Sequence, residues 1–513
     1  MLQKMTGRFC GSLAAALLAA PGCCGTLPDV PDITPSAMPR IGTIDARFQS
    51  YNIEMVEVTG GRFWKPYRSE PGVPIPPPQN ESDTLPGTDS NLYQYRPPID
   101  LTNSRLRKLA AALGPAYVRI SGTWANSTYF ADSEDAPTAP PAGFGGVLTR
   151  RQWRGVIDFA RSVDARIVTS FATSTGSLDA AGVWTPDQAD RLLRFTRSIG
   201  GNIAAAEFMN EPDLAVMGGA PPGYDAHAYG RDFRIFLSFM KQAAPETMIL
   251  GHGTVSEGAA ASDLIAASAS DLDAVSYHFY GTVSGRCHGK ATPDGALSED
   301  WLSRTDRTLA FYKALRDRLA PHKPIWLTET AEAACGGDPW AATFLDAFRY
   351  LDQLGRLAKS GVVVVMHNTL AASDYGLLDE RTLEPRPNYW GAWLWRQLMG
   401  TTVLDAGVRI QSGLHVYAHC LRAMPGGVVV EVINNDRVAP HALRLPTPSL
   451  RYTIDATSLT DDHVRLNGTP LRLGAADALP ALRGIATAAD VLTFAPASIT
   501  FLAISEAANE ACQ

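Results

Sequence analysis

Between about residues 48 and 400, eight short and almost wholly apolar runs alternate with amphipathic helical patterns, and this alternation limits the possible folds most strongly. Such runs are typical of parallel strands that are buried on both faces. Eight strands that alternate with helices predict an α/β chain folded as a (β/α)8 TIM barrel. The alternative is an open doubly wound sheet, but no GxGxxG motif follows the first run to favour it. The expected strands are 47–56, 116–121, 166–171, 203–209, 248–251, 272–280, 324–329 and 361–368.

The segment "TPDQADRLLRFTRSIG" (185–200) shows how the intervening helices are marked. Thr185 is expected as the N-cap, with Pro186 in the first turn and Gln188 completing a capping box. Gly200 is expected to end the helix.

The pattern changes after residue 400, where short strand-like segments follow one another with turns and no helical pattern between them. This predicts an appended C-terminal β-sandwich. We therefore expect a catalytic barrel at 45–400 and a sandwich domain at 401–513. The expected strands of the sandwich are 415–421, 427–435, 441–446, 451–456, 491–496 and 498–504.

Residues 1–25 have the pattern of a secretory signal peptide, in which Lys4 and Arg8 precede the apolar stretch "GSLAAALLAA" (11–20). A lipoprotein-type signal is the alternative, with Cys23 or Cys24 carrying a lipid anchor. We expect an exported protein that is periplasmic, held at the cell surface or secreted. No other stretch is long and apolar enough to predict a membrane span.

The charge distribution argues against nucleic acid as a partner, because the formal net charge is −7 and no long run of Lys and Arg occurs. Removal of the signal would leave four cysteines, an even number that predicts two disulfides in an exported chain, with three connectivities open. The chain has no CxxC pair to indicate a zinc site, and no metal is expected. The four cysteines are Cys287, Cys335, Cys420 and Cys512.

Two of the expected barrel strands lead into glutamates. The fourth runs into Asn210 and Glu211, and the seventh ends at Glu329. Because active sites of such barrels lie at the carboxyl ends of strands, we expect the two glutamates to face one another across the mouth. A single glutamate at a strand end is usually a solvated loop residue or an acid at a helix N-terminus. The pair instead favours glycoside hydrolysis, which needs two carboxyl groups, while Glu332 is expected to be a rim residue.

Several longer segments resemble glycoside hydrolase family 79, the heparanase and β-glucuronidase group of the retaining (β/α)8 glycosidases. The resemblance is carried by "WLTETAEAACGG", "FRYLDQLGRLAKSGVVVVMHNTLAASDYGLLDE" and "PNYWGAWLWRQLMGT". It extends to "GPAYVRISGT", "VYAHC" and the terminal "ANEACQ". These segments together cover most of the mature chain.

The resemblance implies roles for individual residues. Glu211 would be the acid/base, Glu329 the nucleophile, and Asn210 a contact to the sugar. Five further residues would bind substrate, and two of them, Gly336 and Gly337, would hold a uronate carboxylate through their backbone amides. A Cys420–Cys512 disulfide is also implied, which leaves Cys287 with Cys335. The five residues that would bind substrate are Glu54, Tyr280, Tyr375, Gly336 and Gly337.

The turn "AACGG" (333–337) departs from the family pattern, because it lacks the usual tyrosine and contains Cys335. A Cys287–Cys335 bridge beside the pocket would remodel recognition of the carboxylate. Two further residues have alternative interpretations. Arg119 either faces the base of the barrel or pairs with a catalytic carboxylate, and His278 either orients a glutamate or is a buried structural histidine.

The leading hypothesis is a retaining β-glycosidase that acts on β-D-glucuronosides and needs no cofactor, because side chains fill both catalytic roles. One alternative is another β-glycosidase of the same clan, such as a β-xylosidase or an endoglycanase. The other is a non-catalytic carbohydrate-binding protein on the same scaffold. The acidic net charge favours small or lightly charged glucuronosides over long sulfated chains.

Overall fold

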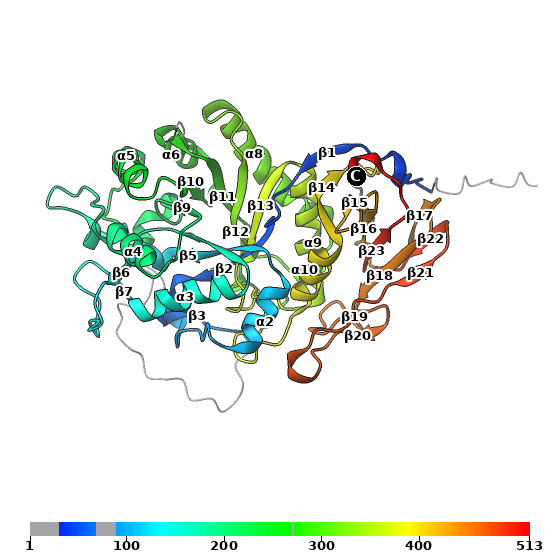
Figure 1. The fold of residues 1–513 in the computed structure, drawn as a ribbon, viewed down its shortest axis with the longest axis horizontal. Helices are drawn as coiled ribbons and strands as arrows, with labels where there is room; N and C mark the ends of the chain where they lie inside the picture. Colours follow the sequence, from blue (N-terminus) through cyan, green and yellow to red (C-terminus); the bar gives the residue numbers. More distant parts are fainter. Residues whose placement is uncertain (1–29, 68–88, 269–270) are drawn as a thin grey trace, which may run out of the picture.

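A barrel and a strand-rich domain lie side by side in the protein (Figure 1). The computed structural model describes residues 30–67, 89–268 and 271–513. The expected signal segment 1–25, with Cys23 and Cys24, lies outside the described residues. Within the described residues, no helix has both the length and the apolar character that a membrane crossing requires.

Eight parallel strands close into the predicted barrel in the order β2-β5-β8-β9-β10-β11-β12-β13, with β13 pairing back to β2. All eight strands expected from the sequence are confirmed, and helices surround the ring (Figure 1). The strands are β2 (Gln49–Glu54), β5 (Ala116–Ser121), β8 (Ala165–Thr169), β9 (Ala205–Glu207), β10 (Met248–Thr254), β11 (Ala274–Val283), β12 (Ile325–Ala334) and β13 (Val362–His367). The longer helices are α2 (Ser104–Ala112), α3 (Arg150–Ser162), α4 (Asp187–Ser198), α5 (Ala226–Ala243), α6 (Ala259–Ser268), α8 (Arg304–Leu319), α9 (Phe344–Lys359) and α10 (Pro387–Leu398), with α1 (Met55–Thr59) and α7 (Glu299–Leu302) as short turns.

The start of α4 differs from the expectation. Pro186, not Thr185, is the N-cap, and no side chain caps the helix. Thr185 Oγ1 donates to the carbonyl of Ser177, and the Gln188 side chain accepts a hydrogen bond from the amide of Phe130. The predicted capping box is therefore wrong, because partners from other loops compete for both side chains.

The interior of the barrel is apolar towards the amino ends of its strands. Successive side chains of a strand point to opposite faces, so residues two apart share a face. Tyr117, Ala205 and Trp326 belong to one buried cluster that draws side chains from seven of the strands. Two residues further along the same strands stand Arg119, Glu207 and Thr328, all buried. A layer of polar side chains therefore follows this apolar cluster towards the carboxyl ends of the strands, and we call it the polar layer.

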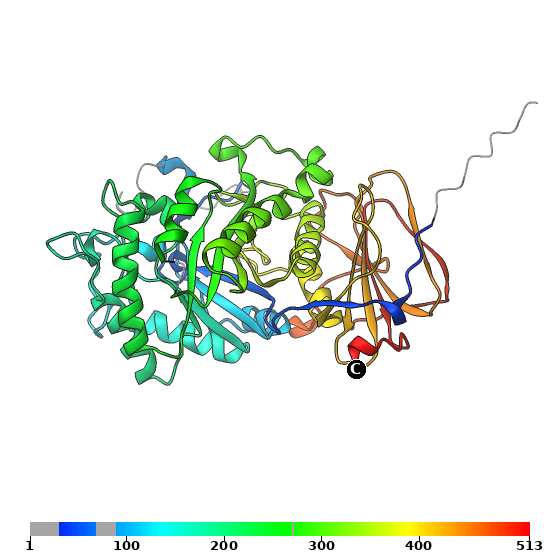
Figure 2. The same cartoon turned by 90° about the horizontal axis from the view of Figure 1, so that it is seen from above.

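The second domain contains all six strands expected after residue 400 and adds several short ones. Its main sheet has the order β1-β14-β15-β16-β23-β18-β19-β20, with β21 beside β18, and β17 pairs with β22 in a small second sheet. Strand β1 (Arg40–Thr43) precedes the barrel in the sequence but pairs antiparallel with β14 (Met399–Leu404). Figure 2 shows this N-terminal segment running from the barrel along the sandwich. The remaining strands are β15 (His415–Leu421), β16 (Val428–Asn434), β17 (His441–Leu445), β18 (Ser449–Asp455), β19 (Arg465–Leu466), β20 (Thr469–Pro470), β21 (Ile485–Thr487), β22 (Asp490–Phe494) and β23 (Ser498–Ile504).

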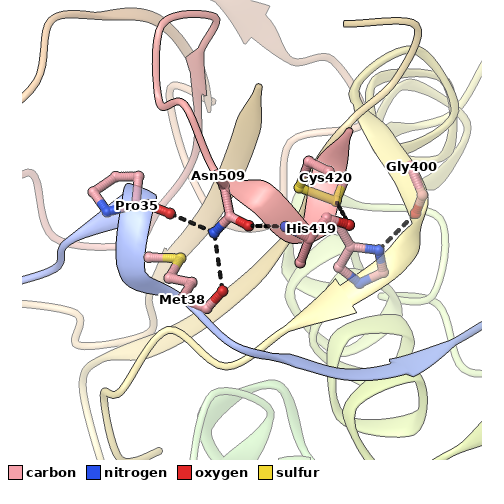
Figure 3. Close-up of a disulfide and its surroundings, with 8 residues drawn as sticks. Pro35, Met38, Gly400, His419, Cys420 and Asn509 are labelled. Atoms are coloured by element: carbon pink, nitrogen blue, oxygen red, sulfur yellow. Dashed lines mark hydrogen bonds between the residues drawn. A yellow bond between two sulfur atoms is a disulfide. The ribbon is translucent and has the colours of Figure 1, made fainter. Parts of the chain in front are cut away.

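The described N-terminal residues and the C-terminus are tied together at one end of the sandwich (Figure 3). Cys420 on β15 forms a disulfide with Cys512 across 92 residues of sequence, as the resemblance implied. Nearby, the side-chain amide of Asn509 donates to the carbonyls of Pro35 at 2.7 Å and Met38 at 2.9 Å. A disulfide that closes a long loop typically contributes about 2–4 kcal/mol to the free energy of unfolding.

Charged side chains fill the junction between the barrel and the sandwich. On α9, the guanidinium of Arg356 contacts Asp352 at 2.6 Å and Glu299 at 2.7 Å. Asp352 also accepts a hydrogen bond from Tyr417 on β15 and contacts His415 Nδ1, both at 2.5 Å. His415 Nε2 lies 3.0 Å from a carboxylate oxygen of Glu299. We call these five residues the junction network.

Candidate active site

Glu211 lies in the loop that follows β9, in an uncommon backbone conformation. Its φ is 45° and its ψ is 67°, the left-handed region that residues with a side chain rarely adopt. The next residue, Pro212, begins a 3-10 helix that ends at Gly218. Asn210 is fixed by a reciprocal pair of 2.8 Å hydrogen bonds, one at its amide and one at its carbonyl, with the side chain of Asn126. Such strain persists where the surroundings enforce it, which is common at functional sites.

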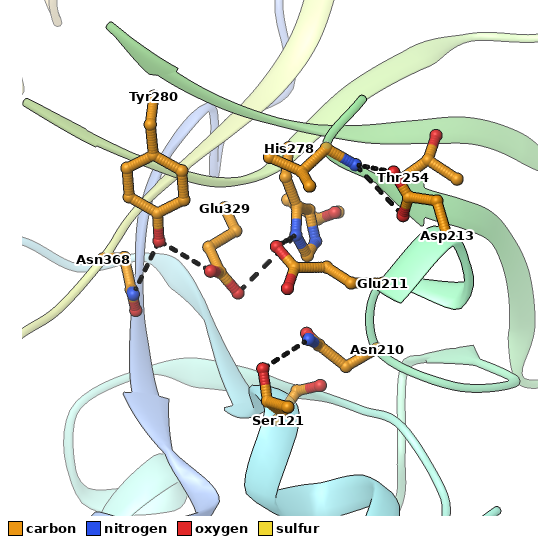
Figure 4. Close-up of polar contacts among 12 residues, drawn as sticks. Ser121, Asn210, Glu211, Asp213, Thr254, His278, Tyr280, Glu329 and Asn368 are labelled. Carbon is orange, nitrogen blue, oxygen red and sulfur yellow. Dashed lines mark hydrogen bonds and ion pairs between the residues drawn. The ribbon is translucent and has the colours of Figure 1, made fainter. Parts of the chain in front are cut away.

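Glu329 lies within β12, at an irregularity of the strand. The pairing register between β12 and β13 shifts between Leu327 and Thr330. The side chains on either side of Glu329 have opposite directions, because Thr328 bonds Glu207 inside the barrel and Thr330 bonds Gln353 on α9. A shift of this kind re-aims side chains near active sites. Glu329 is thereby directed into the mouth of the barrel (Figure 4).

Glu211 and Glu329 face one another across His278 (Figure 4). One oxygen of each carboxyl group and a ring nitrogen of His278 all lie within 4.8 Å of one another. Three such groups have the spacing of metal ligands. However, the cationic Arg119 already contacts Glu329 at 2.8 Å and His278 Nε2 at 3.2 Å. A metal ion here would be repelled by that guanidinium, so the geometry favours chemistry performed by the carboxyl groups themselves.

Arg119 is the hub of the polar layer. Besides Glu329, its guanidinium bonds Glu207 and the side-chain oxygen of Asn210, each at 2.8–2.9 Å. Of the two interpretations of Arg119 from the sequence, pairing with a carboxylate is therefore the one observed. Glu207 is fully buried and also accepts hydrogen bonds from Ser276 and Thr328. Sequence reasoning missed this role of Glu207, although a carboxylate within the apolar run "AAAEFM" was the available signal.

Burial and nearby charge set the protonation of Glu211. Loss of water around its carboxyl group, followed by the negative charge of Asp213, raises the pKa of Glu211 to about 8. Burial also lowers the pKa of His278, so its ring is neutral. Because Arg119 can only donate, His278 Nε2 must accept, and Nδ1 therefore carries the hydrogen that is directed to Glu211 Oε1 at 3.0 Å. Of the two interpretations of His278, orientation of a glutamate is the one observed.

Glu207 behaves in the opposite way. Burial alone would raise the pKa of Glu207, but the charge of Arg119 is the largest of several causes that hold that pKa below its ordinary value. Glu207 is thus a fixed negative charge that keeps Arg119 in place beside Glu329. The second hydrogen-bond partner of Glu329 is the hydroxyl of Tyr280, which donates to Oε1 at 2.6 Å.

The carboxyl group of Glu54 lies at the end of β2 and is joined to this cluster through Asn368. The Asn368 side-chain amide donates to Glu54 Oε1 and to the Tyr280 hydroxyl, both at 3.0 Å, and to the Tyr375 hydroxyl at 3.3 Å. Burial, followed by the charge of Glu329, raises the pKa of Glu54 well above its ordinary value. Among the described residues its other oxygen, Oε2, has no hydrogen-bond partner. A Cβ atom at Gly122 would lie 1.4 Å from this oxygen, so a side chain there would displace the carboxyl group of Glu54.

The structure brings Glu54, Tyr280 and Tyr375 to the same side of Glu329, together with Asn368. One signal for Asn368 was available in the sequence, because it is the last residue of the eighth expected strand, 361–368. Polar side chains at that position of a barrel strand are exposed to the mouth.

Gly336 and Gly337 form a turn after β12, with φ values of 82° and 81°. A Cβ on Gly337 would approach the backbone nitrogen of Tyr375 to 3.2 Å, so the turn packs against this tyrosine. Within the described part of the chain, neither glycine amide donates a hydrogen bond to a protein acceptor. The predicted bridge between Cys287 and Cys335 is formed directly beside the turn.

The expectation for Glu332 is wrong, because this residue is fully buried rather than at the rim. Strand β12 continues to Ala334, beyond the expected end at 329. Glu332 accepts a hydrogen bond from the amide of Asp338 at 3.0 Å. Burial, followed by the charge of Asp346 on α9, raises the pKa of Glu332 well above its ordinary value. This side chain therefore faces the helix layer and not the mouth.

Comparisons with known proteins agree with the geometry. Residues 97–355, just over half of the chain, match the family model described as glycosyl hydrolase family 79, N-terminal domain. Heparanase of Mus musculus is 28% identical over 448 residues, which cover 74% of this chain and 82% of heparanase. Hyaluronoglucuronidase of Hirudo nipponia is 25% identical over 465 residues, which cover 81% of this chain and 92% of that protein.

Solved structures support the fold. An α-L-arabinofuranosidase from Thermotoga maritima superposes with a TM-score of 0.64 at 15% identity, over 92% of this chain and 98% of the other. A 4-O-α-L-rhamnosyl-β-D-glucuronidase from Fusarium oxysporum gives a TM-score of 0.57 at 14% identity, over 93% and 99%. At these identities the likeness concerns the architecture of barrel and sandwich alone.

Proposed function

Because the chain belongs to glycosyl hydrolase family 79, we propose that it is a retaining β-glycosidase that uses Glu211 as acid/base and Glu329 as nucleophile. The observation that carries the proposal is the pair itself. The pKa of Glu211 is raised to about 8, whereas Glu329 is paired with the Arg119 cation. Their nearest oxygens lie within 4.8 Å, close to the separation of about 5–5.5 Å typical of retaining enzymes.

In the first step, Glu329 attacks the anomeric carbon while Glu211 gives its proton to the leaving oxygen. His278 donates to Glu211 Oε1, which leaves Oε2 to carry that proton. Arg119 and Tyr280 orient Glu329 through its two oxygens. The bond from the sugar to the leaving group breaks, and a bond from the sugar to Glu329 forms.

In the second step, Glu211 is a carboxylate and removes a proton from water, which attacks the glycosyl–enzyme bond and releases the sugar with its original configuration. Asn210 supports both steps. Its side-chain oxygen is occupied by Arg119, whereas its amide nitrogen makes a long 3.5 Å contact with Thr123 Oγ1 and has a second hydrogen that can be donated to the sugar 2-hydroxyl. Glu54, neutral because of its raised pKa, can donate from Oε2 to another hydroxyl.

We propose β-D-glucuronosides as the substrates. The amides of Gly336 and Gly337, with no protein acceptor among the described residues, can bind a carboxylate at C6 of the sugar. The hydroxyl of Tyr375 lies on the same side of the site. The acidic net charge of −7 favours small or lightly charged glucuronosides over long sulfated chains.

We further propose that the protein acts outside the cytoplasm. Two disulfides persist most readily in an oxidising compartment, in keeping with the signal pattern at residues 1–25. A lipid anchor at Cys23 or Cys24 stays a prediction.

The proposal is tested by hydrolysis of 4-nitrophenyl β-glycosides that carry glucuronate, glucose or xylose. We expect the glucuronide to have the largest kcat/KM. Turnover of the xyloside or glucoside alone would refute the glucuronoside assignment and keep the glycosidase. Binding of sugars without turnover of any glycoside would instead favour a carbohydrate-binding protein.

The two roles are separated by azide, a small nucleophile that can occupy the space of a deleted carboxylate. With Glu211→Ala, azide should restore turnover of activated aryl glucuronides and give the β-glycosyl azide. With Glu329→Ala, any rescue should give the α-azide, because attack comes from the face that the nucleophile used. Proton NMR of the product distinguishes the two, and the reverse pattern would exchange the assigned roles.

Loss of the acid should also depend on the leaving group. Glu211→Ala should reduce hydrolysis of glycosides with poor leaving groups by about 10²–10⁴-fold, and activated ones far less. Equal losses for both classes of substrate would be inconsistent with Glu211 as the acid.

A further inference from the structure

The turn that carries Gly336 and Gly337 is unusual because three successive residues have positive φ. The values are 63° for Cys335, 82° for Gly336 and 81° for Gly337. A residue with a side chain costs free energy in this region, so the conformation of Cys335 must be held by its surroundings. The geometry of the two glycine amides thus depends on contacts made from outside the turn.

The loop after β11 supplies covalent support for this turn. Cys287 is bonded to Cys335. In the same loop, the Ser284 hydroxyl donates to the Cys335 carbonyl at 3.3 Å, and the Gly285 amide donates to Asp338 at 2.8 Å. The turn is therefore attached on both sides of its glycines.

Arg286 extends the support to two further loops. Its guanidinium forms an ion pair with Asp374 at 3.0 Å, in which both side chains are less than 10% exposed. It also stacks on the ring of Tyr67, 3.9 Å from the ring centroid, and donates to the carbonyl of Lys65. The amide of Asp374 in turn donates to the carbonyl of Gly336 at 3.0 Å. Arg286, in the loop after β11, thus joins the segment at Lys65 and Tyr67 to the loop after β13, and Asp374 connects it to the turn after β12.

These contacts reach the substrate side without touching the catalytic pair. Tyr375, the neighbour of Asp374, packs against Gly337. Glu329, by contrast, is held directly by Arg119 and Tyr280. A change in the support of the turn should therefore alter how the sugar is bound more than how its bond is cleaved.

We propose that Arg286 and the Cys287–Cys335 disulfide are positioning elements that fix the turn and Tyr375, and that they set the affinity for the carboxylate of the sugar. This inference rests on the proposed glucuronosidase function. Neither element takes part in bond cleavage. The contact of the turn with the carboxylate is made by backbone amides whose direction these elements fix.

The test is the double variant Cys287→Ser/Cys335→Ser, with Cys420→Ser/Cys512→Ser as the matched control in the sandwich. For 4-nitrophenyl β-glucuronide, the first variant should raise KM about tenfold with kcat within about twofold of wild type. The inhibition constant of free D-glucuronate should rise by the same factor, whereas that of D-glucose should not change. The control variant should lower the melting temperature and leave KM unchanged.

A second pair of variants examines the arginine. Arg286→Lys keeps a charge for Asp374 but loses the planar stack on Tyr67 and the second donor that bonds the carbonyl of Lys65, so KM should rise by a smaller factor. Arg451→Lys is the control, because Arg451 also stacks on an aromatic ring, that of Phe494, and lies on β18 of the sandwich. Its KM should equal that of wild type.

If the double serine variant does not fold, the folded Cys420→Ser/Cys512→Ser protein treated with dithiothreitol replaces it. The reagent transfers two electrons to the remaining bridge, which becomes two thiols while dithiothreitol becomes its cyclic disulfide. The same rise in KM is expected. An unchanged KM, or a loss confined to kcat, in an enzyme that hydrolyses the glucuronide would overturn this inference alone. A wild-type enzyme that hydrolyses only other aryl glycosides would refute the proposed substrate as well.

Discussion

The mouth of the barrel and the junction network each bury an arginine among carboxylates and a histidine, yet they protonate differently. At the junction, burial alone would lower the pKa of His415, but Asp352 raises that pKa to about 9. Burial would raise the pKa of Asp352, but His415 and Arg356 lower it to about 2. At the mouth, the pKa of His278 is lowered. The junction is therefore a set of fully charged pairs, whereas the mouth contains a neutral histidine.

The difference arises from the ratio of carboxyl groups to cations. Arg119 contacts Glu207 and Glu329, so in the described part of the chain Glu211 and Glu54 have no cationic partner. Buried carboxyl groups without a partner keep their protons. The pKa of Glu211 is raised to about 8 for this reason, with burial as the larger cause. The two cations of the junction keep the pKa values of Asp352 and Glu299 low, whereas the single cation of the mouth leaves Glu211 as a proton donor near neutral pH.

The prediction with the largest expected effect replaces the arginine of each network, Arg119 or Arg356, with lysine. Lysine keeps the charge and loses the planar guanidinium group. Arg119→Lys should reduce kcat about 10³-fold, because lysine cannot hold Glu329, Glu207 and Asn210 together. Arg356→Lys should leave kcat within about twofold and lower the free energy of unfolding by about 1–3 kcal/mol. Steady-state kinetics and denaturant unfolding measure the two effects.

Both lysine variants need a check of folding, which circular dichroism and the melting temperature provide. If Arg356→Lys lost as much activity as Arg119→Lys, the two networks would not differ in function. If Arg119→Lys lost stability and no activity, Arg119 would be a structural residue of the barrel alone.

The second prediction concerns His415 and the pH dependence of stability. Its pKa in the folded protein, about 9, lies above the ordinary value of 6.5. The stabilisation is therefore complete below pH 6.5 and is lost as the pH rises through about 9. The loss is about 3 kcal/mol for a shift of this size. His415→Asn should remove this part of the pH dependence, as measured by denaturant unfolding between pH 6 and pH 10.

The control for this measurement is His463→Asn, because the His463 side chain is 70% exposed. It should leave the curve of the wild-type protein unchanged. A parallel decline of stability with pH in the wild type and in His415→Asn would show that other groups cause it. The kcat of both variants should stay at the wild-type value.

The sequence predicted the barrel well because its strands are buried on both faces, which leaves a strong apolar signal in each run. It predicted the start of α4 poorly. Thr185 and Gln188 have the right chemistry for a capping box, but tertiary partners, Ser177 and Phe130, bind them instead. Strand β1 was missed for a related reason, since its pairing with β14 bridges more than 350 residues.

At the candidate site, the pattern indicated the residues that end strands, such as Glu211 and Glu329. It left two interpretations of Arg119 open and did not indicate Glu207. Both residues lie within apolar strands, where a polar side chain has no partner visible in the sequence. The shift in β12 that aims Glu329 into the mouth depends on how β13 pairs with it, which no local pattern encodes. Strand β12 also continues to Ala334, beyond its expected end, and this buries Glu332, which the sequence pattern had placed at the rim.

The smallest expected effect is that of replacing Asp213, whose charge influences the pKa of the proton donor, Glu211. Asp213 accepts hydrogen bonds from the amides of Val255 and Ser256, and its negative charge is the second cause of the raised pKa of Glu211. Glu211 must be protonated to act, so kcat/KM should fall as the pH rises above about 8. Asp213→Asn can keep one acceptor and removes the charge, so the pKa of Glu211 should fall and this decline should begin at lower pH. The displacement is small because burial of Glu211 is unchanged. Asp317→Asn, at an exposed carboxylate on α8, should leave the profile in place. A decline that stays in place or moves to higher pH in Asp213→Asn would mean that another group governs it.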